Sequence, residues 1–138
     1  MSNGIETIKD KDEKDGISTF CKCEMNKDTI IIYSGVGFFG GAAISIKVYN
    51  DQFRSSFYEY ADDVKPYKLN KNSEFTGEIS VDSKLQYLQL DKKPTYKIGQ
   101  QLTGYVIITS NEYFENRYGE KLDTNFVKVE MSFTCETK

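Results

Sequence analysis

Residues 126–135 read Phe-Val-Lys-Val-Glu-Met-Ser-Phe-Thr-Cys, and from Val127 onward apolar and polar side chains alternate without a break. Successive side chains of an extended chain point to opposite faces, so the apolar set shares one face and the polar set the other. One dry face and one wet face are typical of antiparallel sheets. The stretch therefore predicts a strand of an antiparallel β fold.

Similar alternation recurs along most of the chain and predicts about eight short strands. The candidate strands are residues 21–25, 30–33, 44–48, 53–60, 75–81, 85–90, 102–109 and 126–135. Such closely spaced strands indicate an all-β fold, either an antiparallel β-sandwich or a partly open barrel. Little helix is expected, at most one or two turns around residues 112–118.

Other residue patterns predict where the sheet is interrupted. Residues 62–73 are polar and rich in Asp, Asn and Lys, which predicts a long loop between two halves of the domain. Residues 102–109 are apolar on both faces, as in a central strand. Gly77 and Gly104 lie inside predicted strands, where glycine indicates a bulge or a sharp bend.

The length of 138 residues is sufficient for one hydrophobic core, which predicts a single β domain over residues 18–138. The segment before it, residues 1–17, is rich in alternating Asp, Glu and Lys and has few large apolar side chains. It cannot bury enough surface to offset the entropy lost on ordering. We expect a flexible leader, which in an exported lipoprotein would tether the domain to its anchor.

Residues 35–40 read Gly-Val-Gly-Phe-Phe-Gly, a literal G-x-G-x-x-G pattern after a strand-like run. A dinucleotide site needs a helix next, whose N-terminal amides bind the pyrophosphate. The following residues alternate with period two at Ile44, Ile46 and Val48, so strand continues and no cofactor is expected. A hairpin, a lid and an apolar contact loop remain open as interpretations of residues 35–41.

Three cysteines are placed on strand faces. Cys21 and Cys23 face the same way on one strand, and Cys135 lies on the dry face of the last one. All three can be small buried hydrophobic residues; alternatively, in an oxidising compartment Cys135 bridges to Cys21 or to Cys23 and leaves the other free. A zinc site would lack its fourth ligand, so no metal is expected.

The composition argues against several functions. The chain contains no His, the usual proton-transfer group near neutral pH, and no Trp, so we expect no enzymatic activity. The net charge is −3 and only two basic residues are Arg, which argues against nucleic acid as the partner. No apolar run approaches the roughly 20 residues of a membrane-spanning helix, so no transmembrane segment is expected.

Localisation stays open: cytoplasmic as the sequence is written, or exported and lipid-anchored if a signal peptide has been removed.

Tyrosines beside carboxylates are the clearest candidate for a site. Tyrosine anchors protein interfaces at low entropic cost, and nearby carboxylates steer a basic partner toward it. The predicted partner-binding residues are Tyr58, Glu59, Tyr60, Asp62, Asp63, Tyr67, Glu112, Tyr113, Glu115 and Tyr118.

Three functions are compatible with these patterns. The first is a protein-binding domain, for example an inhibitor or a toxin-neutralising immunity protein that masks a basic protein partner. The second is a β-barrel that binds a small apolar ligand or lipid, with residues 35–41 as its lid. The third is an accessory domain of a cell-envelope lipoprotein. A filled interior with an acidic, aromatic patch favours the first, and an enclosed apolar pocket favours the second.

Overall fold

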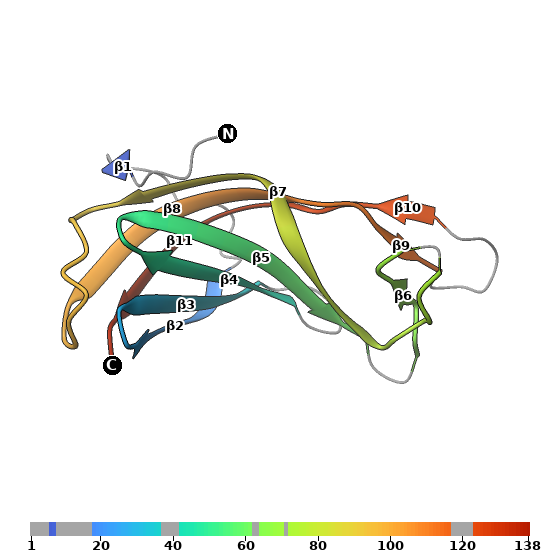
Figure 1. Cartoon of the computed structure of the whole chain (residues 1–138), viewed down its shortest axis with the longest axis horizontal. Helices are drawn as coiled ribbons and strands as arrows, with labels where there is room; N and C mark the ends of the chain where they lie inside the picture. Colours follow the sequence, from blue (N-terminus) through green and yellow to red (C-terminus); the bar gives the residue numbers. More distant parts are fainter. Residues whose placement is uncertain (1–5, 8–17, 37–41, 62–63, 71, 117–122) are drawn as a thin grey trace.

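The computed structural model describes residues 6–7, 18–36, 42–61, 64–70, 72–116 and 123–138, and there the regular elements are all strands (Figure 1). The predicted all-β class is confirmed. The strands are β1 (Glu6–Thr7), β2 (Ser18–Asn26), β3 (Thr29–Val36), β4 (Ala42–Tyr49), β5 (Gln52–Tyr60), β6 (Tyr67–Lys68), β7 (Glu78–Leu90), β8 (Gln101–Ser110), β9 (Tyr113–Glu115), β10 (Asp123–Asn125) and β11 (Lys128–Glu136).

Seven strands form one antiparallel sheet in the order β11-β8-β7-β5-β4-β3-β2. Because seven strands alternate in direction, the first and the last run parallel, and they meet through a parallel bridge between Cys23 and Thr137. The Met25 N–H donates to the Lys138 carbonyl at 3.0 Å, and the Lys138 N–H donates to the Cys23 carbonyl at 3.2 Å. The sheet is thereby nearly closed into a barrel, as one of the two predicted architectures requires.

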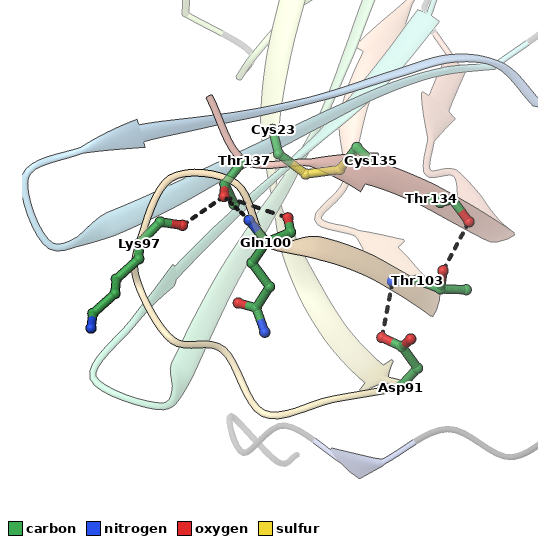
Figure 2. The surroundings of a disulfide bond; sticks show 8 residues. All are labelled: Cys23, Asp91, Lys97, Gln100, Thr103, Thr134, Cys135 and Thr137. Carbon is green, nitrogen blue, oxygen red and sulfur yellow. Dashed lines mark hydrogen bonds between the residues drawn. A yellow bond between two sulfur atoms is a disulfide. The ribbon is translucent and has the colours of Figure 1, made fainter.

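The closure between β2 and β11, which we call the seam, also carries a disulfide between Cys23 and Cys135 (Figure 2). Of the alternatives that the sequence left open, the structure has the bridge, with Cys23 as the partner of Cys135 and Cys21 as the free thiol. The buried Thr137 hydroxyl donates to the Lys97 carbonyl at 2.6 Å and accepts from the Gln100 N–H at 3.0 Å. The end of β11 is therefore fixed both to β2 and to the loop before β8.

β7 is a single strand of 13 residues, not the two strands that the sequence predicts. Its first part pairs with β5 and its second part with β8, with a register shift between Ser83 and Leu85. The extra residue changes the phase of the inward set, from Ile79 and Val81 to Leu88 and Leu90. This bulge lets one strand turn a corner of the barrel while both halves bury their apolar side chains.

A side chain replaces the missing ladder where β5 and β7 separate. The Gln86 amide oxygen accepts from the Ser55 N–H at 3.0 Å, and its nitrogen donates to the Phe53 carbonyl at 2.9 Å. The Ser55 hydroxyl also lies 2.7 Å from that of Ser83. Gln86 thus supplies the donor and the acceptor that a neighbouring peptide would have supplied.

The interior of the barrel is filled by side chains from all seven strands. Of the predicted inward set of the last strand, Val129, Met131, Phe133 and Cys135 are buried there, and Val127 is half-buried against this core. Gly104 faces inward on β8 without any register shift, so the predicted bulge is wrong. A Cβ at position 104 would lie 2.5 Å from Cζ of Phe133. Glycine is required at this position for close packing.

A small sheet of order β10-β9-β6 lies at one end of the barrel (Figure 1). The predicted long loop, residues 62–73, contains one of its strands, β6. The predicted helical turns around residues 112–118 are also wrong, because Tyr113–Glu115 form β9, which pairs with both β6 and β10. Gly77 lies at a bend directly before β7 and not within a strand.

The glycine-rich segment connects two strands that pair with each other. β3 and β4 are antiparallel neighbours up to the pair Val36 and Ala42, as the hairpin interpretation requires. No helix follows, since β4 begins at Ala42. Residues 37–41 themselves lie outside the described residues. In the predicted leader, Glu6 and Thr7 pair parallel to Gln89 and Leu90 of β7.

Candidate protein-binding surface

Two of the predicted tyrosines lie on the outer face of β5, because the inward positions of this strand are taken by Phe53, Ser55 and Phe57. The Tyr58 hydroxyl donates to Oε2 of Glu78 at 2.7 Å, from the neighbouring strand β7. The ring of Tyr60 lies 6.2 Å from that of Tyr58 and is 40% exposed. We call Tyr58, Tyr60 and Glu78 the tyrosine patch.

The electrostatics of the tyrosine patch follow from its hydrogen bond. The Glu78 carboxylate accepts a hydrogen bond from the Tyr58 hydroxyl, which raises the pKa of Tyr58 above its usual value of 10.0, with smaller contributions from burial and from nearby charge. The phenol therefore stays a neutral donor at physiological pH. A patch of this kind presents two aromatic rings beside a carboxylate, and both ring faces and carboxylates attract a cationic side chain.

Glu59 lies between the two tyrosines in sequence but on the opposite face of β5. It is half-buried, and the Tyr113 hydroxyl donates to its Oε1 at 3.4 Å. Its carboxylate therefore faces Tyr113 and does not belong to the outer surface that carries Tyr58 and Tyr60.

Tyr67 and Tyr113 are buried completely, so their prediction as surface anchors has to be corrected. Their ring centroids lie 6.3 Å apart in an edge-on arrangement, and with Ile79 and Val81 they form the small core between the three-stranded sheet and the barrel. Burial, together with the charges of Glu59 and Glu115, raises the pKa of Tyr113 far above its usual value. Tyrosine suits this place because its ring fills the core while its hydroxyl finds a carboxylate.

The remaining predicted residues lie in different environments. Glu112 is exposed just before β9, and Glu115 is half-buried on β9, where it accepts from Nδ2 of Asn125 at 2.8 Å. Asp62, Asp63 and Tyr118 lie outside the described residues. The structure therefore brings Tyr58 and Tyr60 together on the surface and uses Tyr67 and Tyr113 inside.

Sequence reasoning missed Glu78 and a group of exposed apolar side chains. Val64, Leu69 and Phe75 are 46%, 51% and 38% exposed, and they lie in the connection that leads from Tyr60 to Glu78. The Lys68 ammonium stands 4.8 Å from the centroid of the Phe75 ring. The connection that carries them includes β6, which lies at one end of the molecule (Figure 1). Their scattered positions give no periodic signal in the sequence.

Two hollows are prominent among the described residues, and both are partly open to solvent. One, of about 390 Å³, lies where β5 and β7 separate and is lined mainly by polar side chains such as Gln52, Arg54, Asp82 and Asn111. The other, of about 340 Å³, lies at the seam beside the disulfide. Neither has the form of an enclosed apolar pocket.

In the described part of the chain, His, Cys, Asp and Glu side chains form no group of three that could hold a metal ion. The same residues include no helix with the length and apolarity needed to cross a bilayer. A scan of protein-family models, a search of curated proteins and a search of solved structures each found no match to this chain.

Proposed function

We propose that this chain is a non-enzymatic protein-binding domain of the inhibitor or immunity type, which uses the tyrosine patch to cover a basic surface of another protein. The observation that carries this proposal is the pair of outward tyrosines on β5, fixed by the 2.7 Å hydrogen bond from Tyr58 to Glu78. A side chain that is already ordered loses less entropy on binding. Tyrosine and a carboxylate together favour a cationic, amphipathic partner surface.

The exposed apolar residues support the same surface. Phe75 and Val64 lie in the connection between β5 and β7, next to the strands that carry the patch. A contact that combined them with Tyr60 would have an apolar centre and a charged rim, as protein interfaces commonly do.

The filled interior supports protein binding over the second candidate, a barrel for a small apolar ligand. Ile32, Ile46, Leu88 and Ile108 meet inside the barrel and are fully buried, so they occupy the volume in which such a ligand would lie. The ligand would have to displace this core.

One observation favours the third candidate, an accessory domain of the cell envelope. Disulfides persist in oxidising compartments, and the bond between Cys23 and Cys135 fits an exported protein. This candidate is compatible with the first, because an exported domain can bind its partner through the same patch.

Affinity capture from the source cell tests the proposal. The wild type, the double variant Tyr58→Ala/Tyr60→Ala and a control, Tyr33→Ala, would each be immobilised under conditions that preserve the disulfide. Tyr33 is half-buried on the outer face of β3, two strands from β5. We expect a basic protein that is retained by the wild type and the control, lost from the double variant, and released by increasing salt.

The proposal would be wrong if the double variant retained the same proteins as the wild type. It would also be wrong if all retained proteins were lost equally from Tyr33→Ala. Circular dichroism of each variant separates a loss of binding from a loss of fold.

A further inference from the structure

All three cysteines of the chain meet at the seam. Cys23 and Cys135 are bonded with their Cα atoms 5.8 Å apart, and Cys21 precedes Cys23 by two residues on the same face of β2. All three line the same hollow of about 340 Å³. The free thiol therefore lies beside the disulfide and borders the same space.

Extending the register of the seam brings Cys21 toward Cys135. The parallel bridge pairs Cys23 with Thr137, and parallel strands advance together. Extended two residues back along both strands, this register makes Cys21 a neighbour of Cys135 across the seam, while the present bond joins Cys135 to Cys23, with the two Cα atoms 5.8 Å apart. Adjacent strands lie about 4.8 Å apart, which is within the range of Cα separations that a disulfide accepts.

β2 is irregular at the position where movement would be needed. Its pairing with β3 is regular from Cys21 onward, but a register shift separates Ser18 from Cys21. A displacement of Cys21 toward β11 therefore disturbs the start of the ladder and not its middle.

We propose that Cys21 is an exchange thiol that converts the bond between Cys23 and Cys135 into a bond between Cys21 and Cys135. The Cys21 thiolate attacks Sγ of Cys135, the new sulfur–sulfur bond forms, and the old bond breaks. Cys23 leaves as a thiolate and takes up the proton that Cys21 lost. The exchange needs no external oxidant or reductant, and the seam keeps one covalent link throughout.

Attack on Cys23 instead of Cys135 is disfavoured by geometry. Residues two apart on an extended strand have Cα atoms about 6.6–6.8 Å apart with parallel Cβ vectors. That separation is at the limit for a disulfide, and the side chains do not converge. The exchange therefore moves the β2 end of the disulfide from Cys23 to Cys21, and β11 stays covalently linked to β2.

Protonation sets the rate of this exchange. Burial raises the pKa of Cys21 to about 11, although hydrogen bonds from Lys22 and Ser34 act in the opposite direction. The charged groups that line the hollow are Lys22, Glu24, Glu136 and Lys138, and the first two form an ion pair at 2.9 Å. Only the thiolate attacks, so the rate should rise about tenfold per pH unit between pH 7 and pH 10.

The sequence allows the two linkages to be distinguished directly. Trypsin cleaves after Lys14, Lys22, Lys27 and Lys128, so each cysteine falls on a different peptide: residues 15–22, 23–27 and 129–138. After the free thiol has been capped in acid, mass spectrometry of the digest identifies which pair is joined. Cys23→Ser in a glutathione redox buffer tests whether Cys21 reaches Cys135, and Cys21→Ser is the matched control.

We expect Cys23→Ser to give peptide 15–22 linked to 129–138, and the control to give only 23–27 linked to 129–138. In the wild type, the 15–22 linkage should appear faster as the pH is raised from 7 to 10. The proposal is overturned if folded Cys23→Ser keeps both thiols free. If that variant does not fold, the wild type decides: absence of the 15–22 linkage after prolonged incubation at pH 10 overturns it equally.

Discussion

The side-chain amide of Gln86 is hydrogen-bonded to the backbone N–H of Ser55 at 3.0 Å, at the point where β7 leaves β5. The same amide donates to the Phe53 carbonyl, so one side chain of β7 satisfies a backbone donor and a backbone acceptor of β5. This contact joins strands that are no longer neighbours in the ladder.

Removal of this amide should destabilise the barrel. Gln86→Ala leaves a backbone donor and an acceptor of β5 without partners, and each such loss costs about 1–3 kcal/mol where water does not replace it. Because the site borders a hollow that is open to water, we expect a loss near 2 kcal/mol in the free energy of unfolding. Urea denaturation measures it. Gln101→Ala, at an exposed position on β8, should change stability by less than about 0.5 kcal/mol. Equal effects of the two variants would contradict this role.

The disulfide should contribute more than any single hydrogen bond. It closes a loop with a sequence separation of 112 residues, for which chain entropy predicts about 4.8 kcal/mol. Cys135→Ser, which prevents any disulfide across the seam, should therefore lower the free energy of unfolding by roughly 2–5 kcal/mol. Denaturation of the wild type with and without a reductant provides an independent measure. A change below about 1 kcal/mol in both experiments would show that the barrel does not depend on this link.

Gly104 should not tolerate a side chain. An added Cβ would approach Cζ of Phe133 to 2.5 Å and the Gln89 carbonyl oxygen to 2.8 Å, and the second of these is backbone. Gly104→Ala should cost about 1–3 kcal/mol through overpacking. The matched control is Thr109→Ala on the outer face of the same strand, for which about 0.5 kcal/mol is expected. A neutral Gly104→Ala would mean that β8 and β11 can separate locally at no cost.

Tyr105 should make stability sensitive to alkaline pH. Burial, followed by its hydrogen bond to Glu130, raises its pKa from 10.0 to about 12. The fold therefore favours the neutral phenol, and this stabilisation is complete below about pH 10 and is lost as the pH rises toward 12. Tyr105→Phe should be less stable than the wild type at pH 8 but should lose less stability between pH 10 and pH 12. Urea midpoints measured across this range test the prediction; parallel curves for the two proteins would contradict it.

The alternation of Val129, Met131 and Phe133 was sufficient to predict their strand and its buried face, because a period of two follows from backbone geometry alone. The bulge in β7 also has a signal in the sequence, since the inward residues change from Ile79 and Val81 to Leu88 and Leu90. From the sequence alone, this signal predicts two separate strands. The structure shows one continuous strand, β7, whose first part pairs with β5 and whose second part pairs with β8.

The candidate site was harder to predict from the sequence than the strands were. Tyrosine is amphipathic, so nothing local distinguishes Tyr60, which is exposed, from Tyr67, which is buried. The partnership of Tyr58 with Glu78 depends on β5 and β7 being neighbours, which alternation does not encode. The short β9 likewise forms only because β6 and β10 supply its partners, and an isolated three-residue segment has no clear preference for strand or helix.

Photo-crosslinking from position 60 tests the proposed binding surface most directly. A benzophenone amino acid would replace Tyr60 in one protein and Tyr33 in another, and both would be irradiated in the cells that produce the natural protein. We predict one adduct of defined mass from position 60, none from position 33, and loss of that adduct when Tyr58→Ala is added. Adducts from position 33 alone, or an adduct from position 60 that is unaffected by Tyr58→Ala, would contradict the tyrosine patch as the binding surface.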